Sequence, residues 1–173
     1  IGMALAEKAS SNSSIKRFTY ILAGDGDLQE PIALGASTLA GHWKLSNLIM
    51  FYDKNDIQIE GNTSRVDSTD YSKLYDAMGW HVQEIDGHNH TEIRSALKSA
   101  QLNDKPSIII GRTVIAKGSY SLENSSKSHG SPFSEDEIKL TKEKLKIPHD
   151  SFFCNEDIIG HFQRNFDTLN DKI

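Results

Sequence analysis

The sequence predicts an α/β fold in which a parallel sheet carries helices on both faces. Short apolar runs alternate along the chain with longer segments in which apolar residues recur every three or four positions. The apolar runs show no strict alternation, as is typical of strands covered on both faces. Polar, glycine-containing turns follow the first of these runs, at the strand ends where open α/β sheets bind ligands.

The first part of the chain predicts two strands of the sheet, each preceded by a helix. Residues 2–10 are rich in Ala, Leu, Glu and Lys, which favour a helix. Residues 18–23 carry Phe, Tyr and Ile and predict a strand that is covered on both faces. Residues 30–40 predict a helix, because Pro31 suits a first turn where its missing N–H has no intrahelical partner anyway. Residues 48–52 form the second apolar run and predict the next strand.

The second half continues the alternation. Residues 70–78 predict a short helix that Gly79 ends, and residues 80–85 predict a third strand. Residues 91–102 predict an amphipathic helix, and residues 107–110 predict a fourth strand. Strands that alternate with helices in this way predict a parallel sheet with crossover connections.

A polar loop and two further helical segments follow the sheet. Residues 116–132 are rich in Ser, Gly, Asn and Lys, and loops of this length within compact domains are mostly functional or disordered. We expect a functional loop. Residues 134–145 predict a charged helix with a capping box, exposed to solvent and without chemistry of its own. A final amphipathic segment carries Ile158, Ile159, Phe162 and Phe166.

Composition limits the classes of function. The 173 residues suit a single domain of ordinary size, and a net charge of −5 argues against a nucleic-acid partner. The single cysteine, Cys154, excludes a disulfide framework and a multi-cysteine metal site. The sequence has no signal peptide and no apolar run near the roughly 18 residues of a membrane span, so we expect a cytoplasmic protein without membrane contact.

The chain begins within a helical pattern. Ile1 opens it without an initiator methionine or a capping residue. We therefore expect a piece of a longer protein, truncated at its N-terminus.

Two polar turns carry the candidate metal site. Asp25 lies between Gly24 and Gly26, which would permit positive φ and close approach to the main chain. Asn55 follows thirty residues later, after the next strand, so the two side chains should meet at one edge of the sheet. With the main-chain carbonyl of Ile57 they supply three oxygen ligands, and Mg²⁺ takes six, which leaves places for a diphosphate and a water. Alternatively, Asp25 caps the following helix and Asn55 only forms a turn.

His129 is the candidate for ligand contact outside that edge. It lies in the long polar loop beside Gly130, where it could donate to a phosphate or move a proton near neutral pH. His81 begins a strand and is expected to be structural. The remaining histidines are expected to be solvent-exposed: His42, His88, His90, His149 and His161.

Four segments resemble the transketolase family: Gly24–Glu30, Ser37–Leu45, Phe51–Gly61 and Ser128–Pro132. Within them, Gly-Asp-Gly followed about thirty residues later by Asn is similar to the signature of thiamine diphosphate enzymes. The resemblance runs from Ile1 to roughly Phe153. It implies the thiamine-diphosphate-binding fold and makes residues 1–173 part of the N-terminal, diphosphate-binding domain of such an enzyme.

The resemblance also implies a set of site residues. The cofactors would be thiamine diphosphate and Mg²⁺, with Ca²⁺ or Mn²⁺ able to substitute. Asp25, Asn55 and the carbonyl of Ile57 would ligate the metal. His129 would reach both the diphosphate and the substrate, as the catalytic residue of this chain. The cofactor-binding set would be Gly24, Asp25, Gly26, Asn55, Ile57, Ile59 and His129.

The implied reaction transfers a two-carbon ketol unit from a ketose phosphate to an aldose phosphate, within the pentose phosphate pathway. The implied partner is the pyrimidine-binding domain across a homodimer interface, so this chain alone is expected to be inactive. The sequence departs from the family at two places. Gly35 replaces a common glutamate, which leaves undecided whether carboxylates connect the two active sites of the dimer. Ala116-Lys117-Gly118 replaces a Gly-aromatic-Gly pattern, which leaves the role of the substrate loop undecided. Dihydroxyacetone synthase, another thiamine diphosphate enzyme and a non-catalytic split subunit remain alternatives.

Overall fold

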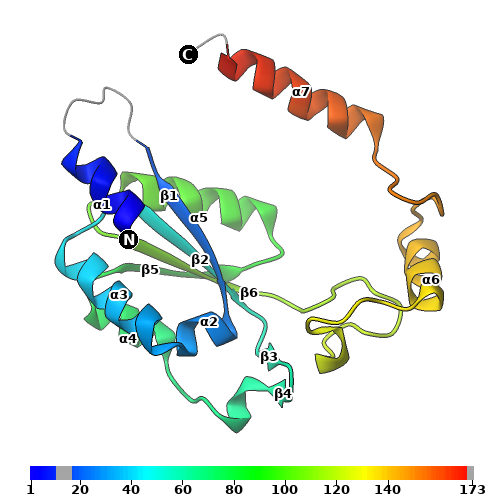
Figure 1. Ribbon diagram of the computed structural model, residues 1–173, viewed down its shortest axis with the longest axis horizontal. Helices are drawn as coiled ribbons and strands as arrows, with labels where there is room; N and C mark the ends of the chain where they lie inside the picture. Colours follow the sequence, from blue (N-terminus) through cyan, green and yellow to red (C-terminus); the bar gives the residue numbers. More distant parts are fainter. Residues whose placement is uncertain (11–16, 171–173) are drawn as a thin grey trace. The chain divides into compact units, whose positions relative to one another are not determined.

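The computed structural model describes residues 1–10 and 17–170 (Figure 1). Although the length suits one domain, the chain divides into two compact units. The first comprises Ile1–Lys117 with Leu122–Pro132, and the second comprises Gly118–Ser121 with Phe133–Ile173. The predicted site residues all belong to the first unit.

A four-stranded parallel sheet forms the centre of the first unit, which confirms the predicted fold class (Figure 1). Its order is β1-β2-β6-β5, with β6 inserted between two strands that precede it in the chain. The strands are β1 (Thr19–Gly24), β2 (Leu48–Lys54), β5 (His81–Asp86) and β6 (Ser107–Arg112). Gly24 pairs with Asp53, which pairs in turn with Gly111, so the carboxyl ends of these strands meet at one edge.

Five helices accompany the sheet in the described part of this unit: α1 (Gly2–Ala9), α2 (Asp25–Gln29), α3 (Pro31–His42), α4 (Tyr71–Ala77) and α5 (His90–Leu102). Neither α2 nor the small hairpin of β3 (Ile57–Gln58) and β4 (Gly61–Asn62) was expected from the sequence, which predicted polar loops there. Short 3₁₀ turns follow at η1 (Thr63–Arg65) and η2 (Ser126–Ser128).

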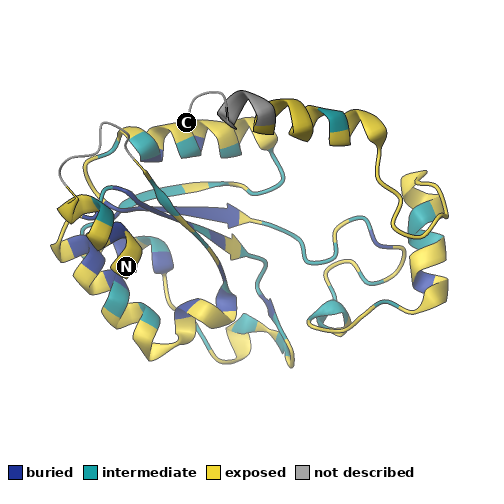
Figure 2. Cartoon of the chain, turned by 45° about the horizontal axis from the view of Figure 1, so that its top comes forward, coloured by how far each residue is buried: buried dark blue, intermediate teal, exposed yellow. Residues whose placement is uncertain are grey.

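The sheet is covered on both faces, as predicted, and β2 shows how. Leu48, Met50 and Tyr52 point into the larger core, which they share with residues of α1, α2, α3 and α4. Ile49 and Phe51 point to the opposite face, where they join the core beneath α5. Because successive side chains of a strand alternate between faces, one continuous apolar run supplies both cores. The central strands are accordingly mostly buried, whereas the helices expose their outer sides (Figure 2).

The prediction that the first strand is covered on both faces was wrong. β1 is an edge strand, and Tyr20 and Leu22 are 53% and 84% exposed on it. Ile21 and Ala23 face the larger core. Apolar composition alone cannot distinguish an edge strand from a central one, because both supply at least one buried face.

Close packing joins α3 to α4. Gly41 was expected to stop α3 but lies within the helix, and it is buried. A Cβ there would overlap the carbonyl oxygen of Met78 and lie 3.0 Å from its carbonyl carbon. Trp80 Nε1 donates to the carbonyl of Ser37 at 2.8 Å, which ties α3 to the start of β5. The glycine is therefore required by interhelical contact rather than by helix termination.

The second unit contains α6 (Glu135–Leu145) and α7 (Glu156–Asn170). α6 was expected to be a purely solvated helix, but its Glu137 is buried. That carboxylate accepts hydrogen bonds from the amide of Ser121 at 2.8 Å and from its hydroxyl at 2.7 Å. Glu137 thus holds the adjoining loop segment against α6. Within the described residues of both units, no helix combines the length and apolarity needed to cross a membrane.

Candidate functional site

Asp25 occupies the carboxyl edge of the sheet, at the point where β1 ends. It is the first residue of α2 and is only 5% exposed. The flanking glycines do not use the positive φ that is open to them: Gly24 has φ −99°, and Gly26 lies within the helix. Gly24 instead caps α2, since its amide donates to Asp27 Oδ2 at 2.8 Å. The Gly-Asp-Gly sequence therefore forms a helix start that carries a buried carboxylate.

Two donors hold the carboxylate of Asp25. The hydroxyl of Tyr52 donates to Oδ1 at 2.6 Å, and the main-chain amide of Asp56 donates to Oδ2 at 3.0 Å. Burial raises the pKa of Asp25, and the hydrogen bond from Tyr52 and the charge of Lys54 offset this in part. The site thus holds a desolvated carboxylate for which a cation would supply the countercharge.

Asn55 shapes the turn that brings Asp56 to Asp25. Its Oδ1 accepts a hydrogen bond from the amide of Ile57 at 3.0 Å, and its Nδ2 donates to Asp53 at 3.4 Å. Asp56 adopts φ 60°, the left-handed conformation that Asp and Asn tolerate best among non-glycine residues. The turn-forming alternative for Asn55 is therefore realised. The structure also brings this turn to Asp25, as the metal hypothesis requires.

The β3–β4 hairpin continues from this turn. Ile57 is buried, whereas Ile59, between the two strands, is 71% exposed. Gln58 Nε2 donates to Gln29 Oε1 at 3.0 Å, which links the hairpin to α2. A Cβ on Gly26 would meet only Gln58 Nε2, at 3.9 Å. The hairpin side of α2 therefore has room for a ligand to approach the main chain.

His129 lies directly after η2, in the expected polar loop. Its Nδ1 is buried and has no hydrogen-bond partner among the residues that the structure describes. Within the described residues no hydrogen bond joins His129 to Asp25 or Asn55, so the structure does not tie the histidine to the turn. A buried ring nitrogen without a partner is a group that a ligand can satisfy.

A hollow of about 530 Å³ lies along the same edge of the sheet, beside Gly24. His88 and Thr113, which the sequence analysis did not assign to the site, help to line it. The expectation of a solvent-exposed His88 was wrong, since its Nε2 accepts a hydrogen bond from the amide of Val114 at 2.9 Å. The hydroxyl of Thr113 donates to Asp53 Oδ1. Both contacts order the main chain after β6, and only the tertiary structure reveals them.

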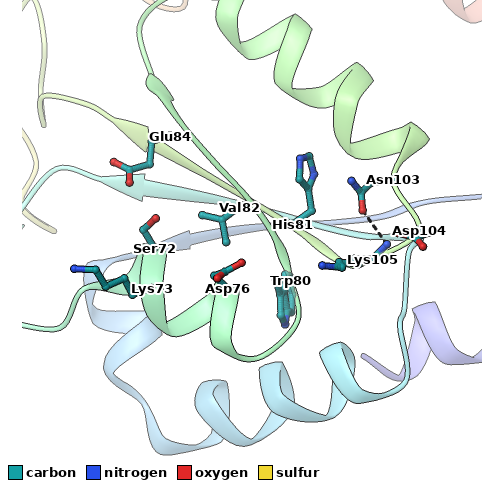
Figure 3. A pocket seen from close by; sticks show the side chains of 10 residues that line it. All are labelled: Ser72, Lys73, Asp76, Trp80, His81, Val82, Glu84, Asn103, Asp104 and Lys105. Atoms are coloured by element: carbon teal, nitrogen blue, oxygen red, sulfur yellow. Dashed lines mark hydrogen bonds between the residues drawn. The ribbon is translucent and has the colours of Figure 1, made fainter.

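A second groove, of about 620 Å³, lies beside β5 (Figure 3). Its walls include His81 at the start of β5 and the segment Asn103–Lys105 just before β6. It shares no residue with the predicted site, and ligands of parallel sheets bind at the carboxyl ends of strands rather than at their beginnings. We therefore assign it no part in the site.

The donor set at Asp25 suits a hard divalent cation. Among residues 1–10 and 17–170, no group of three or more His, Cys, Asp or Glu side chains is arranged to hold a metal ion. A site here would instead combine one carboxylate with the amide oxygen of Asn55 and a main-chain carbonyl. Such oxygen donors are those that Mg²⁺ and Ca²⁺ prefer, so the residues present fit this cation.

Comparison with known proteins identifies the family. The sequence matches the family described as "Transketolase, thiamine diphosphate binding domain" over residues 1–172. It is 38% identical over 175 residues to a chloroplastic transketolase of Zea mays, covering 95% of this chain and 26% of that protein. It is 41% identical over 162 residues to a transketolase of Sinorhizobium medicae, covering 91% of this chain and 23% of that protein.

Solved structures agree with the sequence relatives. A transketolase of Campylobacter jejuni superimposes with a TM-score of 0.87 at 41% identity, covering 90% of this chain and 26% of that one. A transketolase of Leishmania mexicana gives a TM-score of 0.91 at 32% identity, covering 98% and 27%. The chain thus spans about a quarter of the length of these relatives. It belongs to the family of transketolase thiamine diphosphate-binding domains.

Proposed function

We propose that this chain is the cofactor-anchoring part of a transketolase, which transfers a two-carbon ketol unit from a ketose phosphate to an aldose phosphate. Family membership supports the class of enzyme. The observation that carries the site is the buried carboxylate of Asp25, which is hydrogen-bonded to the turn that contains Asn55 and Ile57. When bound, thiamine diphosphate supplies the chemistry that breaks and forms the carbon–carbon bond.

The first task of this chain is to hold the metal and the diphosphate. Asp25, Asn55 and the carbonyl of Ile57 would ligate Mg²⁺, or Ca²⁺ or Mn²⁺ in its place. The diphosphate and water would supply the further oxygen ligands that such a cation takes. Gly24 and Gly26 carry no side chain that could obstruct the diphosphate. Ile57 and the exposed Ile59 would provide apolar contact to the rest of the cofactor.

His129 would bind the phosphate groups of the cofactor and the substrate. Its Nδ1, which no described residue satisfies, can carry a proton and donate to the cofactor diphosphate or to a sugar-phosphate substrate. As a group that also touches substrate, it is the proposed catalytic residue of this chain.

The proposal includes a homodimer in which the partner subunit contributes a pyrimidine-binding domain. Ile32, Leu34 and Leu39 of α3 are exposed, as expected of a helix that another subunit covers. Since the chain spans about a quarter of its relatives, we expect it to show no turnover alone. We also propose a cytoplasmic location and a role in the pentose phosphate pathway. A sequence with one cysteine, which is not in a disulfide here, is compatible with that compartment.

The decisive experiment is a calorimetric titration of the intact protein with thiamine diphosphate, with and without Mg²⁺. We expect tight binding only with Mg²⁺, and loss of that dependence in Asp25→Asn. Asp76→Asn is the matched control, because it removes an exposed carboxylate from α4 and should bind as the wild type does. Affinity that is indifferent to Mg²⁺, or an Asp25→Asn protein that binds normally, would refute the metal site. Absence of ketol transfer by the intact protein would refute the reaction.

A further inference from the structure

We propose that Tyr52 is a positioning residue that presets the carboxylate of Asp25 for Mg²⁺. The inference rests on the proposed function, since it takes Asp25 to be a metal ligand. Tyr52 would not touch the cation or the cofactor. It would act through the geometry of the carboxylate.

The first support is the hydrogen bond itself. Tyr52 lies on β2 opposite Ala23 of β1, and Ala23 is two residues before Asp25. The Tyr52 side chain belongs to the same core as Leu28 of α2. Its hydroxyl donates to Asp25 Oδ1 at 2.6 Å, and Tyr52 is only 1% exposed. A short hydrogen bond from a buried phenol to a carboxylate is strong and directional.

The second support is the restraint on the tyrosine ring. The ring of Tyr71 packs edge-on against that of Tyr52, with centroids 5.5 Å apart and planes at 70°. The hydroxyl of Tyr71 donates in turn to Asp67 Oδ2 at 2.7 Å, and Asp67 Oδ1 accepts from the amide of Thr69 at 2.9 Å. This succession of contacts runs from the loop before α4 to Asp25. Tyr52 is thus fixed by packing as well as by its own hydrogen bond.

The third support is how the donors divide between the two carboxylate oxygens. Tyr52 occupies one lone pair of Oδ1, and the amide of Asp56 occupies one lone pair of Oδ2. Each oxygen keeps a further lone pair, and the plane of the carboxylate is defined by one donor from β2 and one from the turn that follows β2. Mg²⁺ demands near-octahedral geometry, so a carboxylate held in one orientation should favour it.

The alternative is that Tyr52 only fills the core and that Asp25 merely satisfies its buried hydroxyl. The two roles differ in metal selectivity. Ca²⁺ accepts irregular and variable coordination, whereas Mg²⁺ does not. Loss of positioning should therefore weaken Mg²⁺ binding more than Ca²⁺ binding, whereas a purely structural loss should weaken both equally.

The test compares Tyr52→Phe with the wild type in the intact protein, by calorimetric titration of Mg²⁺ and of Ca²⁺ in the presence of thiamine diphosphate. We expect the Mg²⁺ affinity to fall about tenfold, the lower end for residues that orient a metal ligand. We expect the Ca²⁺ affinity to fall less than about threefold, because Ca²⁺ tolerates a displaced carboxylate. Tyr75→Phe is the matched control, since it removes a buried hydroxyl bonded to Ser37 at 3.0 Å and should change neither affinity.

A second variant keeps the test decisive if Tyr52→Phe folds poorly. Tyr71→Leu removes the ring that abuts Tyr52 but retains both atoms of the Tyr52–Asp25 hydrogen bond. It should lower the ratio of Mg²⁺ to Ca²⁺ affinity in the same direction. An unchanged ratio in the folded variants overturns the inference.

Asp25→Asn separates this inference from the proposed function. If Asp25→Asn binds Mg²⁺ as the wild type does, the metal site itself is wrong. If Asp25→Asn loses Mg²⁺ while Tyr52→Phe keeps it, the metal site stands and only the positioning role fails.

Discussion

The main-chain amide of Asp56 donates to Asp25 Oδ2 at 3.0 Å, although the two residues are 31 positions apart. This contact joins the turn after β2 to the start of α2. It depends on the backbone conformation of Asp56, which has φ 60°. The proposed metal site is therefore built on a main-chain conformation as well as on side chains.

The turn gives a first prediction. Asp56→Val should lower the free energy of unfolding by about 1–2 kcal/mol, because a β-branched residue is strained in the left-handed region. It should also weaken Mg²⁺ binding, since the amide moves away from Asp25. Asp56→Gly lacks the same carboxylate but should keep the turn and bind Mg²⁺ more tightly than Asp56→Val does, because glycine adopts positive φ freely. Urea denaturation and calorimetry measure the two effects, and a Val variant as stable as the Gly variant would contradict this account.

Two glycines of α3 give a second prediction with its own control. Gly41→Ala should destabilise the protein by about 2–3 kcal/mol, because its Cβ would overlap the main chain of Met78. Gly35→Ala should instead stabilise this chain on its own by about 0.5–1 kcal/mol, since its Cβ would meet nothing within 4 Å among the described residues and alanine favours the helix. Thermal and urea denaturation of the two variants provide the comparison. Equal effects would show that the α3–α4 contact is looser than described.

His129 gives a third prediction. Its Nδ1 is buried without a partner in the described part of the chain, so His129→Leu should leave the stability of the cofactor-free protein unchanged or raise it by up to about 1 kcal/mol. The same variant should bind thiamine diphosphate about tenfold more weakly, the effect of losing one hydrogen bond to a charged group. Its KM for the ketose phosphate should rise as well. His42→Leu, at an exposed position of α3, should alter none of these quantities; a similar loss there would remove the specific role of His129.

His81 gives a prediction about pH. Burial, together with the charge of Lys105, lowers the pKa of His81 below its ordinary value of 6.5, and its Nδ1 lies 3.2 Å from the hydroxyl of Ser107. As the pH falls through 6.5, the unfolded chain binds a proton that the folded protein resists, so stability is lost on acidification and is fully present above that pH. Urea denaturation at a series of pH values should therefore show a steeper acid loss for the wild type than for His81→Gln. Parallel curves would refute the assignment.

Much of the fold is predictable from the sequence because the four strands of the sheet and most helices can be recognised from the pattern of apolar residues within each segment. The apolar runs that became β2 and β6 and the periodic segment that became α5 lie within a few residues of their expected ranges. Parallel pairing then brings the ends of β1 and β2 together, so Asp25 and the turn of Asn55 could be assigned to one edge in advance. The sequence did not predict α2, because Gly-Asp-Gly is typical of turns and a helix of five residues is too short to show helical periodicity.

The sequence by itself determined the class of fold, the sheet edge to which the proposed site is assigned and the family resemblance, because these depend on periodicity and on motifs of neighbouring residues. Only the tertiary structure decided that β1 is the exposed edge strand and that position 41 has no room for a Cβ. It also decided which groups donate hydrogen bonds to the carboxylate of Asp25. In the sequence, Tyr52 is only one residue of an apolar run that predicts a strand. In the structure, its hydroxyl donates to the carboxylate of Asp25, 27 positions away. Strand periodicity assigns a side chain to a face, but its hydrogen-bond partner depends on how separate elements pack. The packing of β2 and the turn after it against α2 therefore gives the carboxylate of Asp25 a defined orientation.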